Sequence, residues 1–206
     1  MKNISIAILI ILLFYACNSD YEEKVNYSLE QKIYSQIFPE LVDTLLYLVV
    51  LEDEFQNLPL EDRKEIIYQE RMNVYVDSNL YPPDSTYLIE FDNDYLLRQF
   101  RSDSLVRLVK SYPKLGIDTT SLNLDELWDG GRYKILSLDY DSVPYQYPNK
   151  IGIVFLSQIL FNEKKNFGCF YYTFYRDPDT SVGFLVTIKL KNDEWSIQDY
   201  YHLWIS

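Results

Sequence analysis

Glycine is confined to the second half of this 206-residue chain, where all six glycines lie at or after Gly116. Helices form readily without glycine, whereas turns and bulges between strands use it. The chain up to about residue 115 is therefore predicted to be helical, and residues from about 130 to 206 to form strands. Helices followed by strands indicate the α+β class, with amphipathic helices packed on a sheet.

Three amphipathic helices are predicted in the first half. Their apolar stripes are Leu41, Leu45, Leu48, Val49 and Phe55; Ile66, Ile67 and Val74; and Leu97, Phe100, Leu105 and Leu108. Pro39 lies near the start of the first helix and Pro59 opens the second. Pro82 and Pro83 break the helical pattern before the third helix, which spans residues 95–112.

The second half changes to a period of two, which is typical of strands. In "VGFLVTIKL" one face carries Val182, Phe184, Val186, Ile188 and Leu190. In "WSIQDYYHLWI" one face carries Trp195, Ile197, Tyr201, Leu203 and Ile205. The turns "NEKKNFG", "RDPDTS" and "KNDE" separate the strands. With a further strand over residues 132–140, they predict an antiparallel meander of about four to five strands.

The N-terminus has the layout of a signal peptide. Lys2 is followed by an apolar stretch of about 11 residues, and Ala16 precedes Cys17. That stretch is shorter than the roughly 20 apolar residues that a membrane-spanning helix needs. We expect residues 1–16 to be a signal peptide, residues 17–27 an acidic tether, and residues 28–206 one domain.

The stretch "LFYAC" resembles the lipobox of bacterial lipoproteins, although Phe14 and Tyr15 depart from its usual leucine and small residue. This resemblance implies that Cys17 carries the acyl chains that anchor the protein in a lipid bilayer. The following "CNSDYEEK" resembles the acidic surface-export tag of Bacteroidota lipoproteins. We therefore expect an outer-membrane lipoprotein exposed at the cell surface, with a periplasm-facing lipoprotein as the alternative.

A second resemblance covers about 50 residues near the C-terminus. The stretches "LSQILFNEKKNFGCFYYTFY" and "KLKNDEWSIQDYYHLWIS" are similar to the C-terminal half of uncharacterised Bacteroidota lipoproteins. Ser157, Phe161, Asn162, Trp195 and the terminal "WIS" carry the likeness, whereas "RDPDTS" replaces the Cys and Gly pairs of many relatives. This family implies a fold but no activity.

The composition excludes several classes of partner. The formal net charge is −12, and a body this acidic repels nucleic-acid phosphates and anionic lipid. Nucleic-acid binding and peripheral electrostatic docking to a membrane are therefore not expected. A cationic protein partner is compatible with the charge.

Few residues offer catalytic or ligating chemistry. His202 is the only histidine and Cys169 the only thiol besides Cys17, so neither a zinc site nor an internal disulfide is expected. Alternation places His202 on one face with Tyr200 and Trp204, and it is a weak candidate for catalysis beside the ordinary structural role of a lone histidine. Two carboxylate pairs, Asp92 with Asp94 and Asp139 with Asp141, alternate as if to share a face. Each pair is a weak candidate for calcium binding or glycoside hydrolysis, beside the ordinary role of Asp in turns. No cofactor is expected.

These observations favour a non-enzymatic lipoprotein that binds another protein or a component of the cell envelope. An acidic immunity or inhibitor protein that masks a basic partner is one concrete form. A small envelope hydrolase using Asp or Glu is the first alternative, and a ligand-binding cup between helices and sheet is the second.

Overall fold

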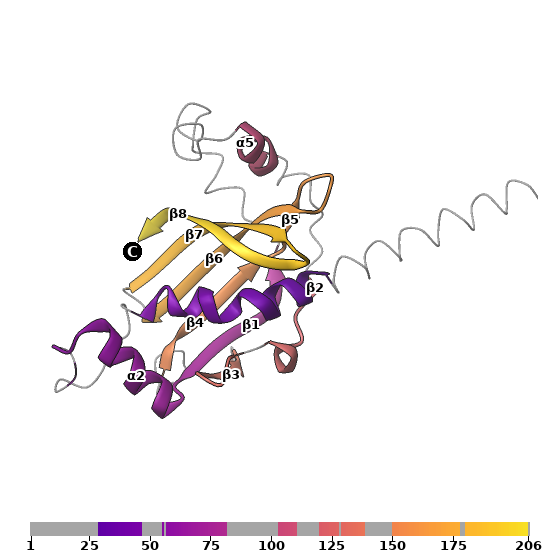
Figure 1. Cartoon of the computed structure of the whole chain (residues 1–206). Helices are drawn as coiled ribbons and strands as arrows, with labels where there is room; N and C mark the ends of the chain where they lie inside the picture. The colour runs from indigo at the N-terminus through magenta and orange to yellow at the C-terminus, as the bar shows by residue number, and fades with distance from the viewer. Residues whose placement is uncertain are drawn as a thin grey trace, which may run out of the picture.

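The structure is a computed structural model that describes residues 29–46, 55, 57–81, 103–110, 120–127, 129–138, 150–177 and 180–205. One helix, residues 29–43, lies across a twisted sheet (Figure 1). The other helices are α2 (Leu60–Glu70), α5 (Asp103–Lys110) and the 3₁₀ turn η3 (Leu124–Glu126). The strands are β1 (Asn73–Tyr81), β2 (Thr120–Ser121), β3 (Lys134–Ser137), β4 (Lys150–Ser157), β5 (Leu160–Phe161), β6 (Phe167–Asp177), β7 (Thr180–Lys191) and β8 (Glu194–Ile205).

The sheet has eight strands and mixed topology, in the order β2-β1-β4-β6-β7-β8. The predicted α+β class with a sheet is confirmed, and β4, β6, β7 and β8 run antiparallel in succession as expected of the meander. The prediction of a purely antiparallel sheet of four to five strands is wrong. Both β3 and β4 pair with β1 in parallel, so the strand predicted at residues 132–140 lies outside the meander.

The helical predictions are partly correct. The first helix in the structure covers residues 29–43, so it passes through Pro39 instead of beginning near it. α2 ends at Glu70, where Arg71 adopts the left-handed conformation with φ 46°. Val74, assigned by its spacing to this helix, lies instead in β1. α5 falls within the third predicted helix, of which residues 95–102 and 111–112 lie outside the described part, as do Leu48 and Val49 of the first predicted helix.

β1 shows why a strand was missed in the supposedly helical half. Its middle reads Asp-Ser-Asn, a sequence typical of turns, and its pairing with β4 shifts register between Val76 and Leu80. Asp77 is buried and accepts hydrogen bonds from the Asn79 backbone N–H at 2.9 Å and the Tyr81 hydroxyl at 2.8 Å. A turn-like hydrogen bond therefore stabilises a bulge inside a strand.

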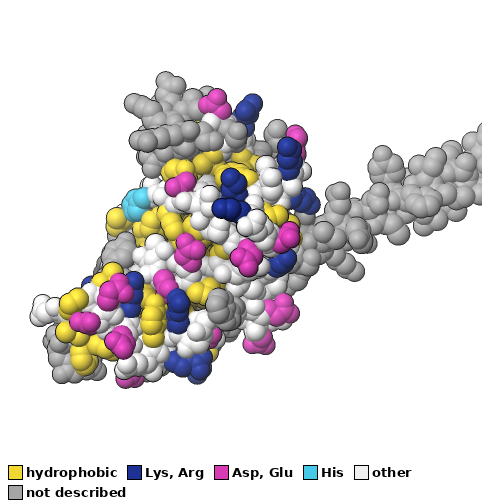
Figure 2. Space-filling view, viewed as in Figure 1, with side chains coloured by type: hydrophobic (Ala, Val, Ile, Leu, Met, Phe, Trp, Pro, Cys, Tyr) yellow, Lys and Arg dark blue, Asp and Glu magenta, His cyan; other side chains and the backbone are white. Residues whose placement is uncertain are grey.

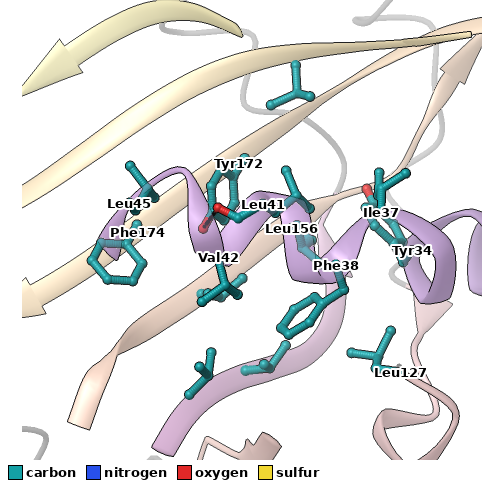
Figure 3. Packing of buried hydrophobic residues seen from close by; sticks show 14 of the residues in the cluster. Tyr34, Ile37, Phe38, Leu41, Val42, Leu45, Leu127, Leu156, Tyr172 and Phe174 are labelled. Carbon is teal, nitrogen blue, oxygen red and sulfur yellow. Dashed lines mark hydrogen bonds between the residues drawn. The ribbon is translucent and has the colours of Figure 1, made fainter. Parts of the chain in front are cut away.

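The main core lies between the N-terminal helix and one face of the sheet, here called the first face (Figure 3). Tyr34 meets Phe170 edge to face at 5.1 Å, and its hydroxyl donates to the Ser157 carbonyl at 2.5 Å. Tyr172 donates in turn to the Leu41 carbonyl at 3.1 Å. Large side chains with polar tips thus fill the interface, and each hydroxyl finds a backbone acceptor.

The opposite face of the sheet, the second face, has a smaller core. Leu105 and Val109 of α5 are buried in a cluster with Leu160, Cys169 and Leu185. Cys169 is fully buried, as expected of an inert structural thiol. β7 consequently has side chains buried on both faces. Its alternating residues face the main core on one side of the sheet and the smaller core on the other, instead of a core and solvent.

The β7–β8 hairpin confirms the turn predicted at "KNDE", because Asn192 and Asp193 both have positive φ, 53° and 63°. The predicted face of β8 is only partly correct. Its pairing with β7 shifts register between Thr187 and Ile188 and again between Gly183 and Phe184. Trp195 and Ile197 belong to the first-face core, whereas Tyr201 and Leu203 pack into the second. Each bulge moves the following side chains to the other face.

Candidate functional site

Side chains from two separate parts of the chain converge on Asp43, at the end of the N-terminal helix. Its carboxylate accepts hydrogen bonds from the Tyr68 hydroxyl at 2.9 Å, from the Tyr133 hydroxyl and from the Arg132 guanidinium. The guanidinium also lies 5.4 Å from the centre of the Tyr68 ring. We call Asp43, Tyr68, Arg132 and Tyr133 the Asp43 cluster. It joins the N-terminal helix to α2 and to the segment before β3.

The electrostatics of this cluster favour a structural role, in which it holds the N-terminal helix in place, over proton transfer. Burial, together with the hydrogen bond to Asp43 and its charge, raises the pKa of Tyr68 to about 12. Burial also raises the pKa of Tyr200, whose hydroxyl accepts a hydrogen bond from Thr44 at 3.1 Å. Both phenols therefore stay protonated near neutral pH. Three donors occupy the Asp43 carboxylate, which leaves it poorly placed to take a proton from a substrate.

Glu30 is a second acidic residue in an unusual position. It is 5% exposed, and its Oε1 accepts the Ile159 backbone N–H at 2.6 Å. Burial raises the pKa of Glu30 from 4.5 to about 7, against the opposing effect of that hydrogen bond. Tyr34 lies close enough that the Glu30 charge contributes to raising the pKa of its hydroxyl. Glu30 therefore fixes the start of the helix to the β4–β5 connection.

Replacing Glu30 with glutamine should flatten the pH dependence of stability. A folded-state pKa above the unfolded value means that protonation favours the folded state, so this contribution is complete below pH 4.5 and is lost as the pH rises to about 7. The loss amounts to roughly 3 kcal/mol. In urea unfolding from pH 4.5 to 8, the free energy of unfolding of Glu30→Gln should rise relative to that of the wild type across that interval. An exposed counterpart, Glu61→Gln, should follow the wild type; parallel profiles for Glu30→Gln would contradict the assignment.

Aromatic side chains form a row across the second face of the sheet. Phe155 of β4 meets Tyr175 of β6 edge to face at 5.3 Å, and Tyr175 meets Trp204 of β8 at 6.3 Å with the rings tilted by 57°. Tyr175 is 36% exposed, and Phe155 and Trp204 are half-buried. We call these three residues the aromatic row.

Gly183 explains how the row crosses β7. It pairs with Trp204, and a Cβ added to Gly183 would lie 2.3 Å from the indole Nε1. Only a residue without a side chain lets the indole lie directly over β7 and reach Tyr175. The second bulge of β8 places Trp204 on this face, so the predicted sharing of a face by Trp204 and His202 is wrong.

His202 is exposed on the first face. It pairs with Phe184 of β7, and its ring meets the Phe184 ring edge to face at 5.4 Å. Tyr200 also contacts Phe184, at 6.0 Å, so Tyr200 and His202 share a face as predicted. The other candidates, Cys17, Asp92, Asp94, Asp139 and Asp141, lie outside the described residues, and the predictions made for them stay predictions.

Sequence reasoning missed Glu30, the Asp43 cluster and the aromatic row. Glu30 had a local signal, because it shares a helical face with Tyr34 and Ile37 at spacings of four and seven. Asp43 had none, since its partners lie 25, 89 and 90 residues away along the chain. The row depends on strand order and on two bulges, which no local pattern specifies.

Comparisons of the chain with family models, curated proteins and solved structures find no match. The site must therefore be interpreted from its own geometry. In the described part of the chain, no helix is long and apolar enough to span a membrane, and no group of His, Cys, Asp and Glu is arranged to hold a metal ion.

Proposed function

We propose that this protein is a non-enzymatic binding module, anchored in the outer membrane through acylated Cys17, that docks a basic protein on its aromatic row. The aromatic row is the observation that carries the proposal. Its partly exposed rings span β4 to β8 on a rigid sheet, and aromatic side chains dominate the energetics of protein interfaces.

The geometry of the rings supports a protein as the partner. Neighbouring rings meet at 77° and 57°, so they present edges and faces in alternation and not one flat platform. Apolar and aromatic side chains of a partner can interdigitate with such a surface, whereas a sugar ring stacks best on a flat one. The net charge of −12 supports a basic partner through electrostatic complementarity.

The enzymatic alternative has less support in the described residues. The Asp43 carboxylate is occupied by three donors, and Glu30 is buried against the backbone. Hydrolysis by the pairs Asp92 with Asp94 and Asp139 with Asp141 stays a prediction for residues outside the described part. The ligand-binding alternative also stays a prediction, although side chains fill the space between the N-terminal helix and the sheet (Figure 3).

Crosslinking in intact cells tests this function. Tyr175→Ala should lower the yield of a specific crosslinked protein by at least tenfold, because truncating a hot-spot aromatic residue at the centre of an interface costs about 2 kcal/mol or more of binding. Ile205→Ala is the matched control, since Ile205 is 72% exposed and pairs with Val182, whose side chain lies on the first face. Partners captured equally by both variants, or acidic partners, would contradict the proposal. Mass spectrometry of the same protein should show acylated Cys17.

A further inference from the structure

β8 is the last strand of the sheet and, with β7, its longest. Within the described residues, Glu194–Ile205 pairs with β7 on one side only, whereas β2 at the other end of the strand order has two residues (Figure 1). Lysine, arginine and proline commonly protect such an edge from pairing, and the sequence of β8, "EWSIQDYYHLWI", contains none of them. β8 therefore presents a long edge that could pair with a further strand.

The hydrogen bonds at the start of β8 show which of its backbone groups face outward. Leu190 of β7 pairs with Trp195, but the Leu190 N–H donates to the Asn166 carbonyl at 2.9 Å and the Trp195 N–H donates to Gln36 Oε1 at 3.0 Å. Leu190 thus faces β6, and Trp195 faces away from the sheet. Every second residue of β7 shares the direction of Leu190. Their partners on β8 consequently face outward, and these are Ile197, Tyr200, His202 and Ile205.

Tyr200 and His202 belong to the regular part of this edge. The two bulges of β8 lie on either side of residues 199–202, here called the open stretch, so pairing with β7 is continuous between them. Tyr200 and His202 each direct one N–H and one C=O outward. Gln36 binds the outward N–H of Trp195, but no described residue bonds to the outward groups of the open stretch. Figure 2 shows the chain's one histidine (cyan) at the surface, beside hydrophobic side chains.

These four backbone groups select an extended polypeptide as their partner, because only a strand offers donors and acceptors at the matching spacing. A strand added about 4.8 Å from β8 brings its second-face side chains beside Tyr201 and Trp204, and Trp204 is the end of the aromatic row. Two copies of this chain would each carry a net charge of −12 and repel one another. The charge therefore favours a segment of a basic protein over pairing between two copies of β8.

We infer that the open stretch of β8 is a template for strand addition, on which an extended segment of the basic partner pairs with Tyr200 and His202. This inference rests on the proposed function, since it names the part of the partner that binds. The added strand extends the surface of the aromatic row beyond Trp204. Backbone hydrogen bonds supply affinity, and the side chains that lie beside the row supply specificity.

A proline at position 202 tests the backbone contact. His202→Pro removes an N–H that faces away from β7, and an edge strand tolerates proline at such a position. The yield of the crosslinked partner should fall about tenfold, because one hydrogen bond is lost and a carbonyl of the partner is left without a donor. His202→Ala is the matched control, since it removes the same side chain but keeps the N–H, and it should leave the yield unchanged. Urea unfolding of both variants shows whether the fold is retained.

Amide hydrogen exchange of the wild-type protein tests the same contact without a substitution. The full chain in detergent micelles is mixed with a peptide of alternating lysine and valine, or with the matched peptide of alternating glutamate and valine. Exchange at Tyr200 and His202 should slow severalfold with the lysine peptide only. Exchange at Tyr201, which faces β7, should not change. Unchanged exchange at all three residues with both peptides overturns the inference.

The outcomes separate this inference from the proposed function. If Tyr175→Ala loses the crosslinked partner but His202→Pro retains it, strand addition is overturned and the aromatic row remains the docking site. If His202→Pro loses the partner but Tyr175→Ala retains it, strand addition is supported and the aromatic row is overturned. A crosslinked product of two copies of this chain overturns the basic segment as occupant, as does equal slowing of exchange by both peptides.

Discussion

Replacing Asp43 with alanine should destabilise the protein by about 3 kcal/mol, since buried donors that lose their acceptor typically cost 1–3 kcal/mol each. Tyr133 is fully buried and loses the carboxylate that its hydroxyl contacts. Arg132 loses its ion partner, and Tyr68 loses its acceptor at 2.9 Å. Thermal unfolding should move down by roughly 6–12 °C.

The control for Asp43→Ala is an acidic residue whose ion pair is exposed. Glu61 pairs with Lys64 at 3.1 Å, and its side chain is 81% exposed. Glu61→Ala should therefore remain within about 0.5 kcal/mol of the wild type. Urea titrations should show a lower midpoint with an unchanged slope for Asp43→Ala. If both variants unfold at the same midpoint, the Asp43 cluster does not fasten the helix, and its hydrogen bonds contribute little.

Replacing Gly152 with alanine should cost about 1–3 kcal/mol by overpacking the main core. A Cβ on Gly152 would lie 2.2 Å from the tip of the Phe174 ring, and Phe174 is fully buried. The ring cannot move freely, because it points from β6 toward the N-terminal helix and packs among that helix's side chains (Figure 3). Chemical unfolding at neutral pH measures the loss directly.

A second substitution shows whether that loss comes from the predicted clash. Phe174→Leu shortens the side chain and removes the ring tip that the new methyl group would meet. Alone, it should destabilise the protein by leaving a small cavity. The double variant Gly152→Ala/Phe174→Leu should be at least 1 kcal/mol more stable than the sum of the two single effects. Strict additivity would show that the alanine is accommodated in another way.

The sequence predicted the elements that local patterns specify. β7 alternates over nine residues, and the glycine-free amphipathic stretches contain α2 and α5. It failed at β1, where a bulge held by Asp77 resembles a turn, and at Val74, whose spacing from Ile67 and Glu70 suits a helix. In both cases the decisive interactions are pairings with β3 and β4, more than 50 residues away in sequence.

The candidate site was less predictable than the fold. The sequence predicts His202 and the aspartate pairs as candidates from their side-chain chemistry alone. The clusters in the structure instead form between residues that are remote in sequence. Asp43 meets Arg132 and Tyr133, and Tyr175 meets Trp204 over Gly183. Such clusters depend on strand order and bulges, which emerge only when the whole sheet has assembled.

The contacts of the N-terminal helix have a consequence for the order of events during synthesis. The helix bonds to Ser157 and Trp195, 123 and 159 residues further along the chain. Its apolar face consequently cannot be buried until almost the entire polypeptide has been made. The delay suits the proposed anchoring at Cys17, which requires the chain to cross a membrane before it folds, because an unpacked leading segment stays available to the export machinery.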